Sequence, residues 1–85
     1  MWYLYVVQCN DMTLYTGIST DVGRRVREHN TTRKGAKYTR VRRPVRLVWS
    51  KEYENRSEAS KAEYSFKKLL HYKKWEIINE DRGCI

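Results

Sequence analysis

The segment from Leu14 to His29 constrains the fold most, because a strand-like run passes within it directly into a helix-like run. The first six residues, to Ser19, have the pattern of a strand, and the Ser-Thr-Asp run that follows supplies N-cap candidates for a helix reaching about Asn30. Gly17 lies inside the strand, where the missing side chain lets another group approach the backbone closely. The segment therefore predicts a strand, a tight turn and a helix, with room for one close contact.

The rest of the chain completes a small mixed fold. We expect strands at 2–9, 14–19 and 45–53, helices at 21–30, 55–71 and 73–79, and a helical turn at 38–43. A polar turn joins the first two strands into a hairpin, and Asn55 is the expected N-cap of the main helix. The predicted class is α/β of the α+β type, a small three-stranded antiparallel sheet flanked by helices in the order β-β-α-β-α-α.

Apolar spacing predicts which faces are buried. Leu47 and Trp49 alternate on one face of the third strand, and Val22 and Val26 lie one turn apart on the first helix. The expected apolar stripe of the main helix consists of Ala59, Ala62, Phe66, Leu69 and Leu70.

Charge points to the class of partner. The 85 residues fit a single domain at 1–85, with a core at 2–79 and a C-terminal tail at 80–85, and the net charge is +8. Such an excess favours a polyanion, most often nucleic acid, although a basic domain without that partner stays open. Cys9 and Cys84 lack the spacing of a zinc site, and with no signal peptide or membrane-length apolar run we expect a cytoplasmic protein.

Glu63 is the most diagnostic candidate residue. It shares the apolar face of the main helix, and a carboxylate there loses hydration unless it is paired or binds a metal ion. It is therefore either a metal ligand or acid of an active site, or an edge residue paired with one of the arginines.

Arg25 and His29 lie four residues apart, on one helix face. The guanidinium suits the charge that develops on a phosphate, and the imidazole can bind phosphate or move a proton. Tyr5 and Tyr15 lie on the paired strands, but the turn does not settle whether their faces coincide. A solvated basic helix face and two cross-strand aromatic partners remain the alternatives.

A basic and aromatic segment follows the first helix. Lysines and arginines can contact phosphates there, and a tyrosine can stack on a base; a basic surface loop with one anchoring tyrosine is the alternative. The candidate nucleic-acid-binding residues are Lys37, Tyr38, Arg40, Arg42 and Arg43.

Taken together, these motifs resemble the GIY-YIG nuclease domain, and most closely its small stand-alone bacterial members. Tyr3-Leu4-Tyr5 stands where the family has Gly-Ile-Tyr, and Tyr15-Thr16-Gly17 where it has Tyr-Ile-Gly. Arg25, His29 and Glu63 then follow in the family's order and spacing.

The resemblance implies a metal-dependent endonuclease that hydrolyses DNA phosphodiester bonds. Glu63 would hold Mg²⁺ or Mn²⁺, Tyr5 with Tyr15 or His29 would position or deprotonate water, and Arg25 would stabilise the transition state. Gly17 would let the backbone pack close to this site.

Two departures from the family affect the expected activity. Tyr3 replaces the first glycine of the motif, and Asn79 is an unaligned candidate for a late asparagine of the family. With no recognition domain, we expect structure-specific cleavage of branched or distorted DNA, or a protein partner that supplies specificity. An inactive nucleic-acid-binding module and an accessory subunit of a DNA repair complex are the alternatives.

Overall fold

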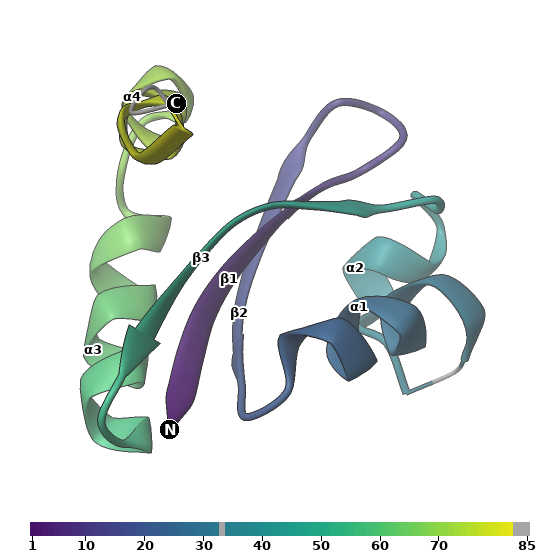
Figure 1. Cartoon of the computed structure of the whole chain (residues 1–85). Helices are drawn as coiled ribbons and strands as arrows, with labels where there is room; N and C mark the ends of the chain where they lie inside the picture. Colours follow the sequence, from purple (N-terminus) through teal and green to yellow (C-terminus); the bar gives the residue numbers. More distant parts are fainter. Residues whose placement is uncertain (33, 83–85) are drawn as a thin grey trace.

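A three-stranded antiparallel sheet forms the centre of the computed structural model, which describes residues 1–32 and 34–82 (Figure 1). The strands are β1 (Trp2–Gln8), β2 (Leu14–Ser19) and β3 (Arg46–Tyr53), in the order β2-β1-β3. The predicted α+β class and antiparallel sheet are confirmed.

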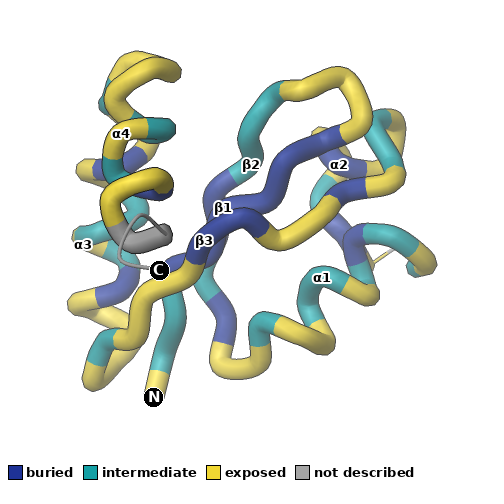
Figure 2. The backbone as a smooth tube through the Cα atoms, turned by 45° about the horizontal axis from the view of Figure 1, so that its top comes forward, coloured by how far each residue is buried: buried dark blue, intermediate teal, exposed yellow. Residues whose placement is uncertain are grey.

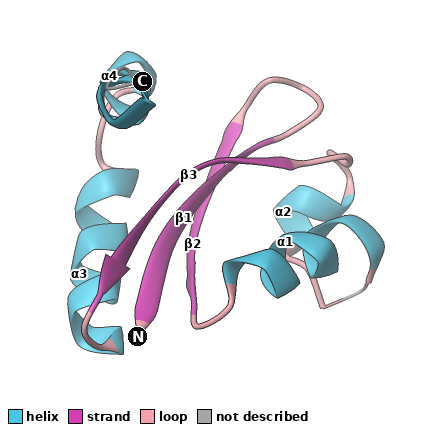
Figure 3. Cartoon of the chain, viewed as in Figure 1, coloured by secondary structure: helices cyan, strands magenta, loops and turns pink. Residues whose placement is uncertain are grey.

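Within the described part of the chain, four helices flank the sheet, and Figure 3 shows them as two pairs. They are α1 (Val22–Thr31), α2 (Lys37–Arg40), α3 (Arg56–Lys67) and α4 (His71–Arg82). Asp21 caps α1 by accepting from the Arg24 amide, and Asn55 caps α3 by accepting from the Glu58 amide. The helical turn predicted before the third strand is therefore present as α2, and both predicted helix starts are confirmed.

Figure 2 shows that most of β1 is buried. Because side chains alternate along this strand, the two faces of the sheet carry separate apolar clusters. Leu4 and Val6 pack with side chains of α3 and α4, whereas Tyr5 and Val7 face Val22 and Val26 of α1. The central strand is thus buried on both faces, and each helix pair covers one of them.

One prediction about β3 is wrong. Val6 pairs with Trp49 but Val7 pairs with Leu47, so a bulge inserts Val48 between them. The extra residue puts Leu47 and Trp49 on opposite faces, and Leu47 is exposed while Val48 and Trp49 are buried. Alternate residues of a strand lie on the same face only where the pairing is regular, and the bulge interrupts this alternation between Leu47 and Trp49.

The long helix predicted at 55–71 ends early, and the second helix predicted at 73–79 is present as α4 but is longer at both ends. α3 ends at Lys67, and Leu70 is 64 % exposed, so it does not belong to the apolar stripe. α4 then continues through the start of the predicted tail to Arg82, and Cys84 lies outside the described residues. Among the described helices, none has the length and apolar character needed to cross a membrane.

Candidate active site

The register of the hairpin brings the two tyrosine motifs to one face. Tyr5 pairs with Gly17, and Val7 pairs with Tyr15, in the antiparallel ladder of β1 and β2. The sequence left this alignment open, and the structure shows that Tyr5, Gly17 and Tyr15 share the face that α1 covers.

Gly17 makes room for the phenol of Tyr5. A Cβ atom at Gly17 would lie 2.6 Å from the Tyr5 hydroxyl oxygen and 2.7 Å from the ring carbon that bears it. No real Cβ tolerates such distances, so a side chain here would displace the phenol. The Tyr5 ring consequently crosses the edge strand β2, with its hydroxyl over the backbone of Gly17.

His29 meets this phenol from α1. Its Nε2 lies 2.7 Å from the Tyr5 hydroxyl, and both side chains are almost fully buried. The ring of Tyr15 packs edge-on against the same imidazole, with 5.3 Å between ring centroids. Tyr5, Tyr15 and His29 therefore form one aromatic and hydrogen-bonded cluster, which the sequence could not establish.

Arg25 lies one turn before His29 and remains partly exposed. Its Nη1 is 3.1 Å from Glu28 and donates to the Lys34 carbonyl at 2.7 Å. The guanidinium also acts on the phenol, because it lowers the pKa of Tyr5 against the effect of burial. Arg25 is thus held beside the phenol and is not part of a freely solvated helix face.

Glu63 approaches the cluster from α3, on the opposite side of the sheet. Its side chain is 24 % exposed and pairs with the Lys67 ammonium at 3.3 Å. α3 packs against β2 as well as β1, and the charge of Glu63 reaches Tyr5, whose pKa it raises. The partner of this carboxylate is a lysine on its own helix, where the sequence suggested an arginine.

Burial sets the protonation of the two central groups. Desolvation raises the pKa of Tyr5 to about 12, with Arg25 opposing and the charges of Tyr15 and Glu63 adding to the rise. Desolvation, followed by the charge of Arg25, lowers the pKa of His29 to about 4. At neutral pH the site therefore holds a neutral phenol and a neutral imidazole.

The predicted nucleic-acid-binding residues divide into exposed and engaged groups. Lys37 and Arg40 are exposed on α2. Tyr38 stacks on Tyr15, with 6.0 Å between ring centroids, and carries the Arg42 guanidinium 3.8 Å from its own centroid. Arg43 is turned inward.

The inward side chain of Arg43 completes the end of α1. Its Nε donates to the His29 carbonyl at 2.6 Å, and its second amino group donates to the Thr32 carbonyl. These carbonyls have no partner within the helix, so Arg43 acts as a cap and its predicted phosphate contact is not supported.

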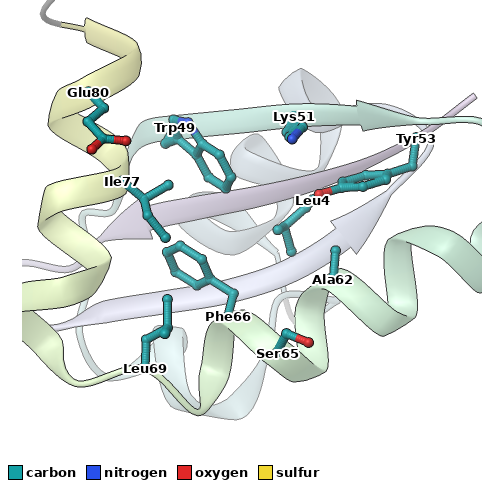
Figure 4. Close-up of a pocket in the computed structure, with 10 residues that line it drawn as sticks. All are labelled: Leu4, Trp49, Lys51, Tyr53, Ala62, Ser65, Phe66, Leu69, Ile77 and Glu80. Atoms are coloured by element: carbon teal, nitrogen blue, oxygen red, sulfur yellow. The ribbon is translucent and has the colours of Figure 1, made fainter.

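A small hollow beside the cluster brings in residues that the sequence analysis missed. Tyr15 and Tyr38 line it together with Lys67 of α3 and Lys74 of α4, around a volume of about 230 Å³. The sequence contains many lysines and arginines and no signal that distinguishes Lys67 and Lys74 from the others. Only the packing of α3 and α4 shows that these two lie beside Tyr15. A larger hollow of about 430 Å³ lies between α3, α4 and β3, but none of the predicted site residues lines it (Figure 4).

The donor set suits one kind of metal ion. Among the described residues, no three His, Cys, Asp or Glu side chains gather in a way that could hold a metal by themselves. Glu63 supplies one partly exposed carboxylate, and a metal ion could take the place of the Lys67 ammonium beside it. Mg²⁺ is commonly bound by one or two carboxylates while waters and substrate phosphate complete its shell, so the residues fit that ion.

Known proteins share both the sequence pattern and the fold. The GIY-YIG catalytic domain family matches residues 1–76. A UPF0213 protein of Desulfotalea psychrophila is 53 % identical over 91 % of this chain and 70 % of its own length. A UPF0213 protein of Staphylococcus aureus is 50 % identical over 92 % of this chain and 94 % of its own.

Solved structures of related proteins have a similar fold. The solution structure of the UPF0213 protein from Bacillus halodurans is 42 % identical, covers 93 % of this chain and 84 % of its own, and has a TM-score of 0.59. A solution structure of a protein from E. faecalis is 46 % identical, covers 88 % and 80 %, and has a TM-score of 0.58.

Proposed function

The chain belongs to the GIY-YIG catalytic domain family of the nuclease superfamily, and from that membership we propose that it is a metal-dependent endonuclease acting on DNA. The observation that supports this most is the buried hydrogen bond of 2.7 Å between Tyr5 and His29, with Arg25 and Glu63 acting on the same phenol. Perturbed ionisable groups that converge from different elements are typical of active sites.

The proposed reaction is hydrolysis by an activated water. The phenol of Tyr5, neutral at rest, first releases its proton to solvent. The phenolate then accepts a proton from the water, whose oxygen forms a new bond to phosphorus while the bond to the leaving oxygen breaks. The leaving oxygen takes its proton from solvent. Arg25 stabilises the negative charge that builds up on the phosphate oxygens, and it also favours the phenolate.

Glu63 is the residue that would hold the divalent cation, Mg²⁺ or Mn²⁺. When bound, such an ion supplies Lewis-acid stabilisation of the scissile phosphate. The Lys67 ammonium, 3.3 Å from Glu63, would then be released towards the hollow that it shares with Lys74.

The substrate we propose is branched or distorted DNA. The exposed Lys37 and Arg40, together with the half-buried Lys74 of the hollow, suit phosphates, which position a nucleic acid but carry no sequence information. Specificity would then come from DNA shape or from a protein partner, and such a substrate would place the protein in DNA repair.

A cleavage screen tests the proposal. Labelled linear, flap and four-way DNA are incubated with the protein, with and without Mg²⁺ or Mn²⁺. We expect metal-dependent products that Glu63→Gln and Arg25→Ala reduce at least about a hundredfold, as for other lost charge-stabilising groups.

Two substitutions on the same helices serve as controls. Glu58→Gln on α3 and Arg27→Ala on α1 alter exposed side chains and should leave cleavage near the wild-type rate. Binding without cleavage of any substrate would contradict the proposal and support a binding module. Absence of both would support the accessory role.

A further inference from the structure

The hydrogen bond between His29 and Tyr5 has a direction, and the contacts of the other ring nitrogen decide it. The backbone N–H of Ala36 points at Nδ1 of His29, with 3.3 Å between the nitrogens. A backbone amide can only donate, so the neutral imidazole must present a lone pair at Nδ1. Its single proton is then on Nε2.

Thr39 supports the same assignment. Its hydroxyl lies 2.8 Å from Nδ1 and 2.9 Å from the Ala36 carbonyl, and it has one proton to give. The Ala36 carbonyl already accepts from the amides of Thr39 and Arg40, each at 3.1 Å, which occupies both of its lone pairs. The hydroxyl can donate to this carbonyl or turn its proton to Nδ1, and because two amides already donate to the carbonyl, we assign the proton to Nδ1.

The opposite tautomer creates a conflict inside the core. A proton on Nδ1 would face the Ala36 N–H, so that two donors would point at each other in a part-buried contact at the ring of the fully buried His29. Burial of the imidazole makes such an unsatisfied arrangement costly.

We propose that Thr39 and the Ala36 amide hold His29 as its Nε2–H tautomer, so that His29 donates a hydrogen bond to Tyr5 and does not receive its proton. Thr39 is thus a positioning residue that acts through His29. The phenol oxygen has His29 as a donor and Arg25 as a neighbouring cation, and both stabilise a phenolate. The catalytic consequence rests on the proposed function, whereas the tautomer itself can be measured without a substrate.

Nitrogen NMR reads the tautomer directly. In ¹⁵N-labelled protein near neutral pH, long-range ¹H–¹⁵N correlations distinguish a protonated from an unprotonated ring nitrogen. The chain has two histidines, so the spectrum of His71→Gln assigns the signals of His29. We expect an unprotonated Nδ1 and a protonated Nε2, and the reverse pattern would overturn the inference.

Substitution of Thr39 tests the positioning role. Thr39→Val keeps the size of the side chain but removes the hydroxyl, which leaves only the 3.3 Å contact of the Ala36 amide to hold the lone pair of Nδ1. A fraction of the Nδ1–H tautomer should therefore appear, and kcat should fall by up to about tenfold with KM little changed. Thr39→Ser keeps the hydroxyl and should restore both the spectrum and the rate. A Thr39→Val protein with the wild-type spectrum would refute the role of the hydroxyl.

The two proposals fail separately. If the wild-type protein shows the Nε2–H tautomer but cleaves no DNA, the tautomer inference holds and the nuclease proposal fails. If Thr39→Val does not fold, the wild-type and Thr39→Ser spectra still decide whether Nδ1 accepts.

Discussion

Acid should destabilise this fold through His29, and the size of the effect follows from its burial. The folded-state pKa is about 4, whereas an unfolded chain has the ordinary value of about 6.5. Between these values the unfolded state binds more protons, so the free energy of unfolding falls as the pH falls. The slope reaches at most about 1.4 kcal/mol per pH unit, and the total loss is at most about 3–4 kcal/mol.

The contacts of His29 explain why acid lowers the free energy of unfolding. At neutral pH the imidazole is uncharged and both of its nitrogens are hydrogen-bonded, to Tyr5 and to the Thr39 and Ala36 pair. Protonation adds a buried charge beside Arg25 and Arg43, both of which lower the pKa of His29. The contribution to stability is thus complete above about pH 6.5 and lost towards about pH 4.

Denaturant unfolding over this pH range measures the effect. The free energy of unfolding of the wild type should fall between about pH 6.5 and about pH 4.5 more steeply than that of His29→Gln, since carboxylates titrate in both proteins. His71→Gln, at an exposed position, should follow the wild type. Equal slopes for the wild type and His29→Gln would refute the reasoning.

Two further variants, one with a single and one with a double substitution, probe the close contact and the cationic hollow. Gly17→Ala puts a Cβ 2.6 Å from the buried phenol oxygen and should lower the free energy of unfolding by about 1–3 kcal/mol. The control Gly23→Ala meets only ordinary contacts and should raise the free energy of unfolding by about 0.5–1 kcal/mol. Equal effects of the two substitutions in denaturant unfolding would contradict the close contact at Gly17. Lys67→Ala combined with Lys74→Ala should weaken DNA binding and reduce the slope of log affinity against log salt by about 1 to 2, measured by fluorescence anisotropy. Lys61→Ala, at an exposed position on α3, is the control. An unchanged slope in the double variant would show that DNA does not contact the lysines of the hollow.

The sequence predicted those parts of the fold that are set by neighbouring residues. The hairpin turn uses an Asp11 side chain that accepts from Thr13, and Asp21 and Asn55 cap their helices as their residue types suggest. Val22 and Val26 face the core because helical spacing requires it. Each of these features needs only a few consecutive residues.

Long-range features were beyond the sequence patterns. The bulge at Val48 is a feature of how β3 pairs with β1, and no local signal marks it. Arg43 was placed with the nucleic-acid-binding arginines because composition cannot tell an exposed guanidinium from one that caps α1. The contact of Thr39 with His29 depends on how α2 packs against α1, so the motif around Tyr38 gave no reason to separate it.

The charges around Tyr5 determine what kind of chemistry the phenol can support. Burial alone makes it a weaker acid than a free tyrosine, and the negative charge of Glu63 works in the same direction. Arg25 opposes both, and any positive charge that pairs with Glu63, whether the Lys67 ammonium or a divalent cation, also favours the phenolate. The pKa of Tyr5 therefore depends on whether the charge of Glu63 is compensated, although α3 covers the other face of the sheet. That coupling joins a tyrosine on β1 to a glutamate 58 positions later in the chain and gives a physical reason for the two to act together.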